Sequence, residues 1–321
     1  MPEFTRSEAK PWAKARVRDF YAAPITPLTK DFELDEAGIR ENIEAYIDWG
    51  VNGLVVGGFA NETWNMRPEW WYRLHEITAD AVKGRTDLWT IILDPCAEVC
   101  VDKLRHVEKL GFSGAELMNP MTQLRGDDEI YNFFKYVTDR SDLGICLYRT
   151  PVSGKVMGLE LLKRLVDIDT VVCTKQGNLN RAESLLLRRE LRDDFIVSDP
   201  TEHFYLDDLR EGGQVLFAEF SYLIYGRKRS VLRSYVDKAR AGDWEGAYAE
   251  WKSLRPIWHL YEDEFMNPLI RTASYASLMS VIKIWCETLG LKAGPMKPPV
   301  QHLPPADRER LVGRIKDLGL V

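Results

Sequence analysis

The chain has 321 residues, of which 45% are hydrophobic and 29% charged, a composition typical of a globular protein with a large core. Its net charge is -6 and its pI is about 5.6, so it offers no basic surface for phosphates, and nucleic acid is excluded as a predicted partner. The charged segment 1–18 lacks the apolar core of a secretion signal, and no run reaches the roughly 18 apolar residues of a membrane span, so we expect a cytoplasmic protein without membrane contact.

Short apolar runs alternate with segments of helical periodicity through the first two thirds of the chain. The apolar runs predict strands, and Asp35 and Pro68 mark the starts of two of the helices between them. The strands are predicted at residues 20–24, 53–57, 88–93, 114–118, 143–148, 171–175, 195–198 and 214–218.

Eight strand-then-helix units, with strands that are apolar on both faces, indicate an α/β fold with a parallel sheet covered by helices. Eight strands close a TIM (β/α)8 barrel, whereas an open doubly wound sheet would need an edge strand with polar residues. After about residue 226, helical periodicity dominates, at 228–241, 244–254, 262–289 and 305–318. We therefore predict an N-terminal extension over 1–18, a barrel over 19–226 and a C-terminal helical region over 227–321.

Lys175 ends the sixth predicted strand and is the most unusual residue for its position. Because burying an ammonium is costly, a lysine there is either held neutral or extends to solvent from the strand end. A neutral amine at a strand end is the nucleophile that Schiff-base chemistry on a carbonyl needs, and the active site of a TIM barrel lies at the carboxyl ends of its strands. Tyr148 ends the fifth strand, and its phenol suits a proton shuttle when a nearby cation lowers its pKa.

The cysteines do not predict a metal site. Cys96 and Cys100 stand four residues apart, but a second pair of Cys or His residues that would complete a zinc site is missing from the sequence around them. The five cysteines are odd in number and lie mostly inside apolar runs, as expected for reduced residues in a cytosolic core.

The motifs and their order resemble the dihydrodipicolinate synthase and N-acetylneuraminate lyase family of class I aldolases. The run Tyr148-Arg149-Thr150-Pro151 matches the Tyr-Asn-x-Pro turn of that family, and Lys175 follows at a suitable interval. Segments 23–28, 50–54 and 294–299 resemble its first strand and Thr-Pro turn, its approach to strand 2 and its Gly-Pro-x-Arg-Pro-Pro close. The likeness spans about residues 19–318. It implies that Lys175 forms the Schiff base and Tyr148 moves protons, that neither a metal nor an organic cofactor is needed, and that the protein is a homo-oligomer, a dimer or tetramer.

The loop after the second strand departs from the family pattern. The family loop Gly-Thr-Thr-Gly-Glu binds the carboxylate of pyruvate, whereas this chain has Gly58-Phe59-Ala60-Asn61-Glu62 and lacks both hydroxyls. We expect the backbone N–H groups of Phe59 and Ala60 and the amide of Asn61 to hold the carboxylate. Phe59 would also form an apolar wall, which suits an apolar or aromatic aldehyde better than a sugar.

Further differences and candidates concern the other strand ends. Pro120 is followed by Met121 and Thr122, where dihydrodipicolinate synthases have a pair of tyrosines, and this argues against a role in lysine biosynthesis. Arg149 either holds a substrate carboxylate in a bidentate pair or points outward to a neighbouring loop. The remaining predicted substrate-binding residues are Thr122, Ser198 and Leu216.

Together these features predict a carbon–carbon lyase of the class I aldolase type. Its substrates would be pyruvate or a related 2-oxo acid and an aldehyde, combined or released by aldol addition, retro-aldol cleavage or a hydratase-aldolase reaction, and it would not be a dihydrodipicolinate synthase proper. Two alternatives stay open: a sugar-acid dehydratase or decarboxylase that uses the same lysine, and a non-catalytic barrel that binds a small ligand.

Overall fold

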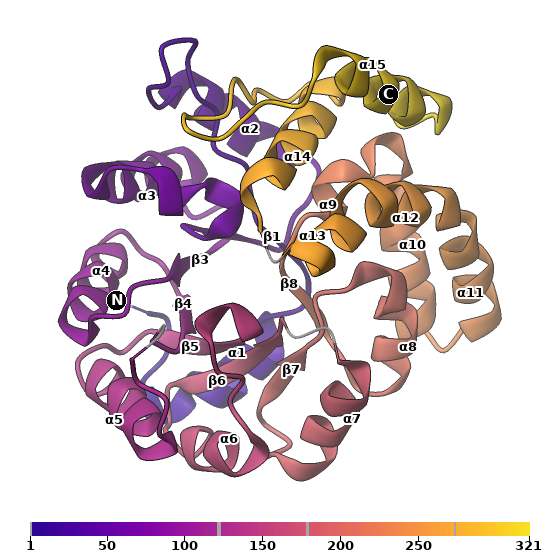
Figure 1. Ribbon diagram of the computed structural model, residues 1–321. Coiled ribbons are helices and arrows are strands. Elements are labelled where there is room, and N and C mark those ends of the chain that lie inside the picture. The colour runs from indigo at the N-terminus through magenta and orange to yellow at the C-terminus, as the bar shows by residue number, and fades with distance from the viewer. Residues whose placement is uncertain (1, 121–122, 178–179, 273) are drawn as a thin grey trace.

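Eight parallel strands form the centre of the computed structural model, which describes residues 2–120, 123–177, 180–272 and 274–321 (Figure 1). The ladder runs in the order β7-β6-β5-β4-β3-β2-β1-β8, as expected for strands joined by helical crossovers. The strands are β1 (Asp19–Ala22), β2 (Gly53–Val56), β3 (Asp87–Ile92), β4 (Gly114–Met118), β5 (Gly144–Arg149), β6 (Val171–Gln176), β7 (Ile196–Ser198) and β8 (Val215–Glu219). The predicted TIM barrel is confirmed.

Ser198 links the two ends of this ladder, at the junction of β7 and β8. Its hydroxyl donates to the carbonyl of Val215 at 2.9 Å and accepts from the backbone N–H of Phe217 at 3.3 Å. These side-chain bonds satisfy backbone groups of β8 on the side that faces β7. Ser198 therefore helps to close the barrel.

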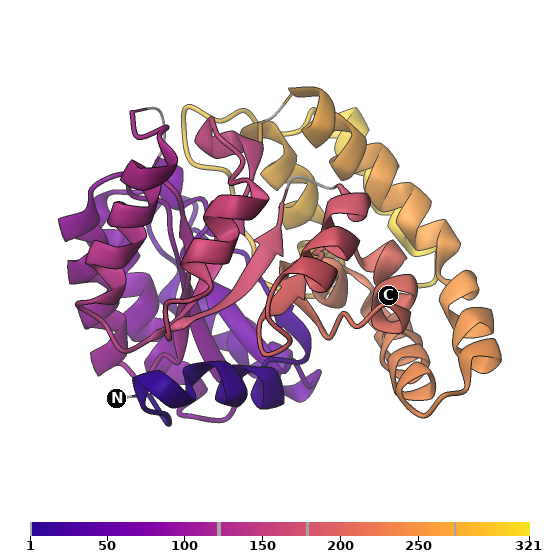
Figure 2. The same ribbon diagram turned by 90° about the horizontal axis from the view of Figure 1, so that it is seen from below.

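Helices surround the strands, and Figure 1 shows α2 to α8 arranged in a ring around the barrel. Asp35 caps α2 as predicted, since its carboxylate accepts from the backbone N–H of Gly38 at 2.9 Å. The shorter α1 crosses beneath the strands (Figure 2), where Lys10 donates to the carbonyl of Ile168 at 2.6 Å. These helices are α1 (Ala9–Arg16), α2 (Glu36–Asp48), α3 (Pro68–Val82), α4 (Ala97–Lys109), α5 (Asp127–Thr138), α6 (Leu159–Leu165), α7 (Arg181–Glu190) and α8 (Tyr205–Arg210).

The remaining helices pack together beside the barrel, and the long predicted helix over 262–289 is interrupted. A π-helical turn, Glu262–Met266, precedes α13, and the chain leaves the helical conformation before α14, so that Tyr275 stands at the N-terminus of α14. These helices are α9 (Ser221–Ile224), α10 (Arg229–Arg240), α11 (Trp244–Ser253), α12 (Arg255–Tyr261), α13 (Asn267–Thr272), α14 (Ala276–Thr288) and α15 (Pro305–Asp317). Periodicity alone did not reveal the interruption, which brings Tyr275 to the barrel mouth.

The inside of the barrel is filled by large side chains next to residues that have none. The fully buried ring of Trp89 fits because β4 has a glycine beside it: a Cβ at Gly114 would lie 2.4 Å from the indole. Strand alternation then places Glu116 on the same inward face as Gly114. The barrel interior therefore combines an apolar floor with a carboxylate one layer below the mouth.

We propose that the chain is organised as an N-terminal extension over 1–18, a barrel over 19–226 and a C-terminal helical region over 227–321. Over the described ranges, the structure contains no helix that is both long enough and apolar enough to cross a membrane.

Candidate active site

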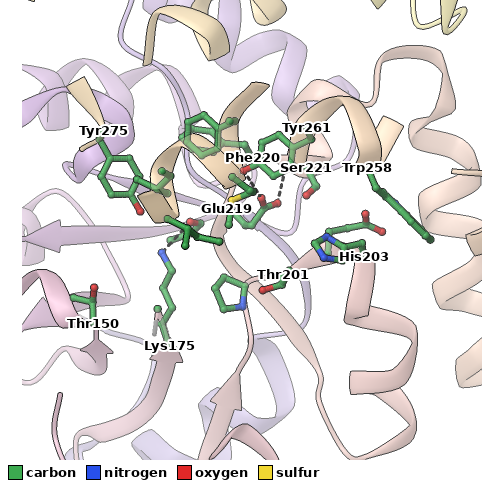
Figure 3. Close-up of a pocket in the computed structure, with 18 of the residues that line it drawn as sticks. Thr150, Lys175, Thr201, His203, Glu219, Phe220, Ser221, Trp258, Tyr261 and Tyr275 are labelled. Atoms are coloured by element: carbon green, nitrogen blue, oxygen red, sulfur yellow. Dashed lines mark hydrogen bonds between the residues drawn. The ribbon is translucent and has the colours of Figure 1, made fainter. Parts of the chain in front are cut away.

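Lys175 lies at the carboxyl end of β6, and its side chain extends into a cavity of about 450 Å³ (Figure 3). The residue is only 8% exposed, and its Nζ donates to the carbonyl of Ala218 on β8 at 3.0 Å. Ala218 has a positive φ of 55°, a conformation that non-glycine residues seldom adopt. The amine is therefore held across the barrel mouth and lines the cavity, as the sequence predicted.

Tyr148 lies beside Lys175 because the two residues are register partners on adjacent strands. The amine is 4.8 Å from the centroid of the phenol ring, and both residues line the cavity. Gly177 makes room for the ring, since a Cβ there would lie 2.6 Å from it. The two predicted catalytic side chains are thus neighbours.

The expectation that a cation lowers the pKa of Tyr148 is wrong. Burial raises the pKa of the Tyr148 phenol above its ordinary value, and the nearby charge of Glu116 raises it further. Hydrogen bonds from Tyr275 and Thr150 oppose the rise by stabilising the phenolate. Tyr148 is therefore protonated at neutral pH.

Tyr275 completes this group from a distant part of the sequence. The Tyr275 hydroxyl lowers the pKa of Tyr148, and Tyr148 in turn raises the pKa of Tyr275. Its ring stacks on Phe59 with centroids 4.8 Å apart and planes 3° apart. Sequence analysis missed Tyr275, and it also did not place Phe59 against a phenol.

Glu116 is a second site residue that sequence analysis missed. Its side chain is fully buried on β4, and Oε1 lies 3.6 Å from Nζ of Lys175, an ion pair too long for a hydrogen bond. Burial raises the pKa of Glu116 to about 7, and the positive charge of Lys175 opposes that rise. At an effective dielectric constant near 20 the attraction in such a pair is about 4 kcal/mol, comparable to the several kcal/mol lost by desolvating each ion. The pair is therefore a poor source of stability.

Asn61 is occupied by the fold of its own loop. Its Oδ1 accepts from the backbone N–H groups of Gly57 and Gly58 at 2.7 and 3.2 Å, and its Nδ2 donates to the carbonyl of Pro24 at 3.0 Å. The side chain is fully buried. Its position supports a role in shaping the loop, and the predicted amide contact with substrate is not supported.

Glu62, the next residue, ties the same loop to the C-terminal helices. Its carboxylate lies 2.7 Å from Nζ of Lys283 on α14, and both side chains are at most 3% exposed. Burial raises the pKa of Glu62 and lowers that of Lys283, while each charge partly restores the other. The ion pair therefore joins this loop to the helix that Tyr275 directly precedes.

Arg149 points away from the cavity, the second of the two orientations that the sequence left open. Its Nε donates to the carbonyl of Met157 at 2.6 Å, and its Nη1 lies 2.5 Å from a carboxylate oxygen of Glu183 on α7. The guanidinium therefore anchors β5 to the outer helices, and its position does not support the predicted substrate contact.

Two of the other predicted substrate-binding residues, Ser198 and Leu216, do not line the cavity, and the third is not among the described residues. Ser198 is fully buried in the β7–β8 junction. Leu216 lies one residue before Phe217, whose ring stacks on Tyr21 inside the barrel, so strand alternation turns Leu216 toward the helices. Thr122 lies outside the described residues.

The far side of the cavity is mostly apolar and comes from the C-terminal helices. Among the described residues that line it, Lys175 is the one lysine or arginine. Glu219 accepts from the hydroxyl of Tyr261 at 3.3 Å and from the backbone N–H of Ser221, contacts that Figure 3 shows as dashed lines. The apolar wall consists of Phe220, Trp258, Phe265, Met266, Leu269 and Ile270.

Metal ligands do not gather at this site. Within the part of the chain that the structure describes, groups of three or more His, Cys, Asp or Glu side chains suited to a metal ion are absent.

Comparisons with known proteins agree with the geometry. The model of the dihydrodipicolinate synthetase family matches residues 16–318. A 4-hydroxy-tetrahydrodipicolinate synthase from Moorella thermoacetica is 26% identical over 302 residues, which cover 93% of this chain and 97% of the relative.

Solved structures share the fold at lower identity. A putative dihydrodipicolinate synthetase from Pseudomonas aeruginosa superposes with a TM-score of 0.80 at 21% identity, covering 94% of this chain and 99% of that chain. The sialic acid aldolase of Ruminococcus gnavus gives a TM-score of 0.80 at 14% identity, covering 95% and 98%.

Proposed function

The chain belongs to the dihydrodipicolinate synthetase family, whose members are lyases of the class I aldolase type, and on this premise we propose that it is a Schiff-base aldolase acting on pyruvate or a related 2-oxo acid. The observation that carries the proposal is the amine of Lys175, which lines a cavity at the barrel mouth beside the phenol of Tyr148. An amine and a proton donor side by side are the two groups that iminium formation requires.

The chemistry follows from the order of the groups. Nζ of Lys175 attacks the keto carbon, and the protonated phenol of Tyr148 donates to the oxygen that becomes a hydroxyl. Loss of water leaves an iminium, and the departing water takes a proton from the neighbouring carbon, so that the electrons of that carbon–hydrogen bond move toward the iminium and an enamine forms. Addition of the enamine to an aldehyde forms the new carbon–carbon bond, and Tyr148 donates to the aldehyde oxygen. The reverse sequence cleaves the same bond.

We place the carboxylate of the 2-oxo acid toward the loop that carries Phe59 and Ala60, on the Tyr148 side of the amine. Phe59 touches the site through its stack on Tyr275, and the backbone N–H groups of the loop are the proposed donors.

The partner is proposed to be an apolar or aromatic aldehyde, and the protein is proposed not to be a dihydrodipicolinate synthase proper. The aldehyde would occupy the apolar wall of the C-terminal helices, where a second anionic group would find carboxyl groups instead of a cation. In addition, the sequence lacks the tyrosine pair that dihydrodipicolinate synthases have after Pro120. The second phenol that acts on Tyr148 belongs instead to Tyr275 of the same chain.

Reductive trapping tests the proposal. The protein is incubated with pyruvate and sodium borohydride, digested, and searched by mass spectrometry for a reduced adduct. We expect the adduct on Lys175, its loss in Lys175→Ala, and its retention in the matched control Lys109→Ala, whose lysine is exposed on α4. Failure to trap pyruvate or any other 2-oxo acid in the wild-type protein would favour a binding protein without this chemistry.

Aldehyde consumption in the presence of pyruvate then identifies the partner. A preference for aromatic over polyhydroxylated aldehydes is expected from the apolar wall. Assembly into a homo-oligomer, a dimer or tetramer, is part of the proposal and is measured by light scattering.

A further inference from the structure

Glu116 stands directly behind the nucleophile, on the strand next to that of Tyr148. We propose that Glu116 is the base that takes the proton from the Lys175 ammonium before attack and returns it when water leaves the carbinolamine. This inference rests on the Schiff-base function proposed above. It adds a catalytic residue inside the barrel, below the layer that contacts the substrate.

The placement of Glu116 follows from strand alternation and register. Gly114 and Glu116 share the inward face of β4, and Glu116 is the register partner of Cys146 on β5. Cys146 lies two residues before Tyr148, so the carboxylate sits one layer below the phenol and the amine. Its Oε1 is 3.6 Å from Nζ of Lys175, close enough for transfer after a small movement of the lysine side chain.

Apart from Lys175, Glu116 is poorly supplied with partners. Both carboxylate oxygens are buried and are without a hydrogen-bond donor among the described residues. A buried polar group with no such partner is costly and uncommon in native proteins. The other titratable groups around the pair offer no compensating cation, and they are Cys146 and Tyr148 on β5, Cys173 on β6, Glu219 on β8 and Tyr275 before α14.

The proton count of the reaction suits such a pair. In the resting site the ammonium of Lys175 faces the carboxylate of Glu116, and transfer gives a neutral amine and a carboxylic acid. Attack joins Nζ to the keto carbon, the π electrons of the carbonyl move to oxygen, and Tyr148 relays one proton from the nitrogen to that oxygen. The carbon–oxygen bond then breaks, and the proton stored on Glu116 leaves with the hydroxyl as water.

The products of these steps are an iminium cation and the carboxylate of Glu116. The site therefore holds one positive and one negative charge both before and after Schiff-base formation. A buried carboxylate that faces an ammonium in the free enzyme faces an iminium in the adduct, and its cost of desolvation is offset in both states.

Burial also gives Glu116 the right acidity for the task. Its pKa is raised to about 7, so it is mostly protonated below that pH and cannot accept a proton from Lys175. A base works best when its pKa is near the working pH. The rate of Schiff-base formation should therefore fall as the pH is lowered through about 7.

The test measures the rate of adduct formation with pyruvate and sodium cyanoborohydride between pH 5.5 and pH 9 (about two units on either side of neutrality). In Glu116→Gln, which keeps the shape but not the charge, we expect a rate at pH 7.5 lower by a factor of roughly 10² and loss of the inflection near pH 7. Glu116→Asp should recover part of the rate and keep an inflection. Glu98→Gln, an exposed change on α4, should behave as wild type.

The outcomes separate this inference from the proposed function. An adduct that forms in wild type and equally fast, with the same pH profile, in folded Glu116→Gln would overturn the role of Glu116 and leave the Schiff base intact. Faster formation in Glu116→Gln would do the same, because it would show that the carboxylate hinders the amine. If wild type forms no adduct, both proposals fail. Should Glu116→Gln not fold, the wild-type profile decides, and a rate without an inflection near pH 7 would reject the inference.

Discussion

Replacing Tyr275 by phenylalanine separates proton transfer from Schiff-base formation. The substitution removes one hydroxyl and keeps the ring that stacks on Phe59 at 4.8 Å. Tyr148 then loses the hydroxyl of Tyr275, which lowers its pKa, but keeps the effect of the Thr150 hydroxyl.

The size of the effect follows from the charge that Tyr148 carries. A hydrogen bond between neutral groups contributes about 1 kcal/mol to stability, whereas one to a charged acceptor contributes about 1.5–3 kcal/mol. Tyr148 becomes a phenolate only after it has given up its proton, so the difference of about 0.5–2 kcal/mol is lost from the transition state. This corresponds to a fall in turnover by a factor of roughly 2 to 30. The free energy of unfolding should fall by only about 1 kcal/mol.

The assay compares three quantities in wild type and Tyr275→Phe: the yield of borohydride-trapped pyruvate adduct, the turnover with an aromatic aldehyde, and the midpoint of urea unfolding. The yield should be nearly unchanged while turnover falls. Tyr248→Phe is the matched control, since that phenol is 51% exposed and distant from the cavity residues. Turnover equal to wild type in Tyr275→Phe would show that the Tyr275 hydroxyl does not act on Tyr148, and the proposed interaction of the two phenols would be rejected.

Two further predictions concern buried charges at the edge of the site. Lys283→Met leaves Glu62 unpaired in a position where its side chain is 2% exposed, so the free energy of unfolding should fall by about 3–5 kcal/mol. Adding Glu62→Gln to this variant should recover most of the loss. If Lys283→Met alone unfolds in urea at the same midpoint as wild type, the prediction is contradicted. Burial raises the pKa of Glu202 from 4.5 to about 7 although it accepts hydrogen bonds from Tyr225 and Tyr235, so the native state binds a proton that the unfolded chain releases between these values. The free energy of unfolding should therefore decrease as the pH rises from about 4.5 to 7 and then level off. Glu202→Gln should remove about 3 kcal/mol of this decrease. Identical pH profiles for wild type and Glu202→Gln would refute the claim that Glu202 causes it.

The barrel and the lysine at its mouth could be predicted from local patterns. The strands are buried on both faces, so each reads as a short apolar run, and the helix between each pair shows its own period. Lys175 was detectable because a charged residue ends an otherwise apolar strand, and Tyr148 ends the strand that lies next to it. The same reasoning would have found Glu116, which interrupts the apolar run 114–118 on the face that points inward.

The direction of individual side chains was less accessible. Arg149 and Lys175 both end strands, yet one pairs with Glu183 outside the barrel and the other lines the cavity. The sequence shows that a residue ends a strand, but it does not show whether the side chain faces the barrel interior or the helices when the strand pairing contains a register shift. The pairing of β5 with β6 contains such a shift near Cys146. The amide of Asn61 suggested a substrate contact, but in the structure it forms hydrogen bonds with the backbone of Gly57 and Pro24.

The sequence by itself determined the strand count, the order of the elements and the amine at the end of β6, because these depend on residues that are close along the chain. Only the tertiary structure decided that Tyr275 meets Tyr148, that Glu62 pairs with Lys283, and that the C-terminal helices form the apolar wall of the cavity. The first two of these contacts join segments separated by more than a hundred residues, and hydrophobic periodicity states which face of a helix is buried without stating against which partner it packs.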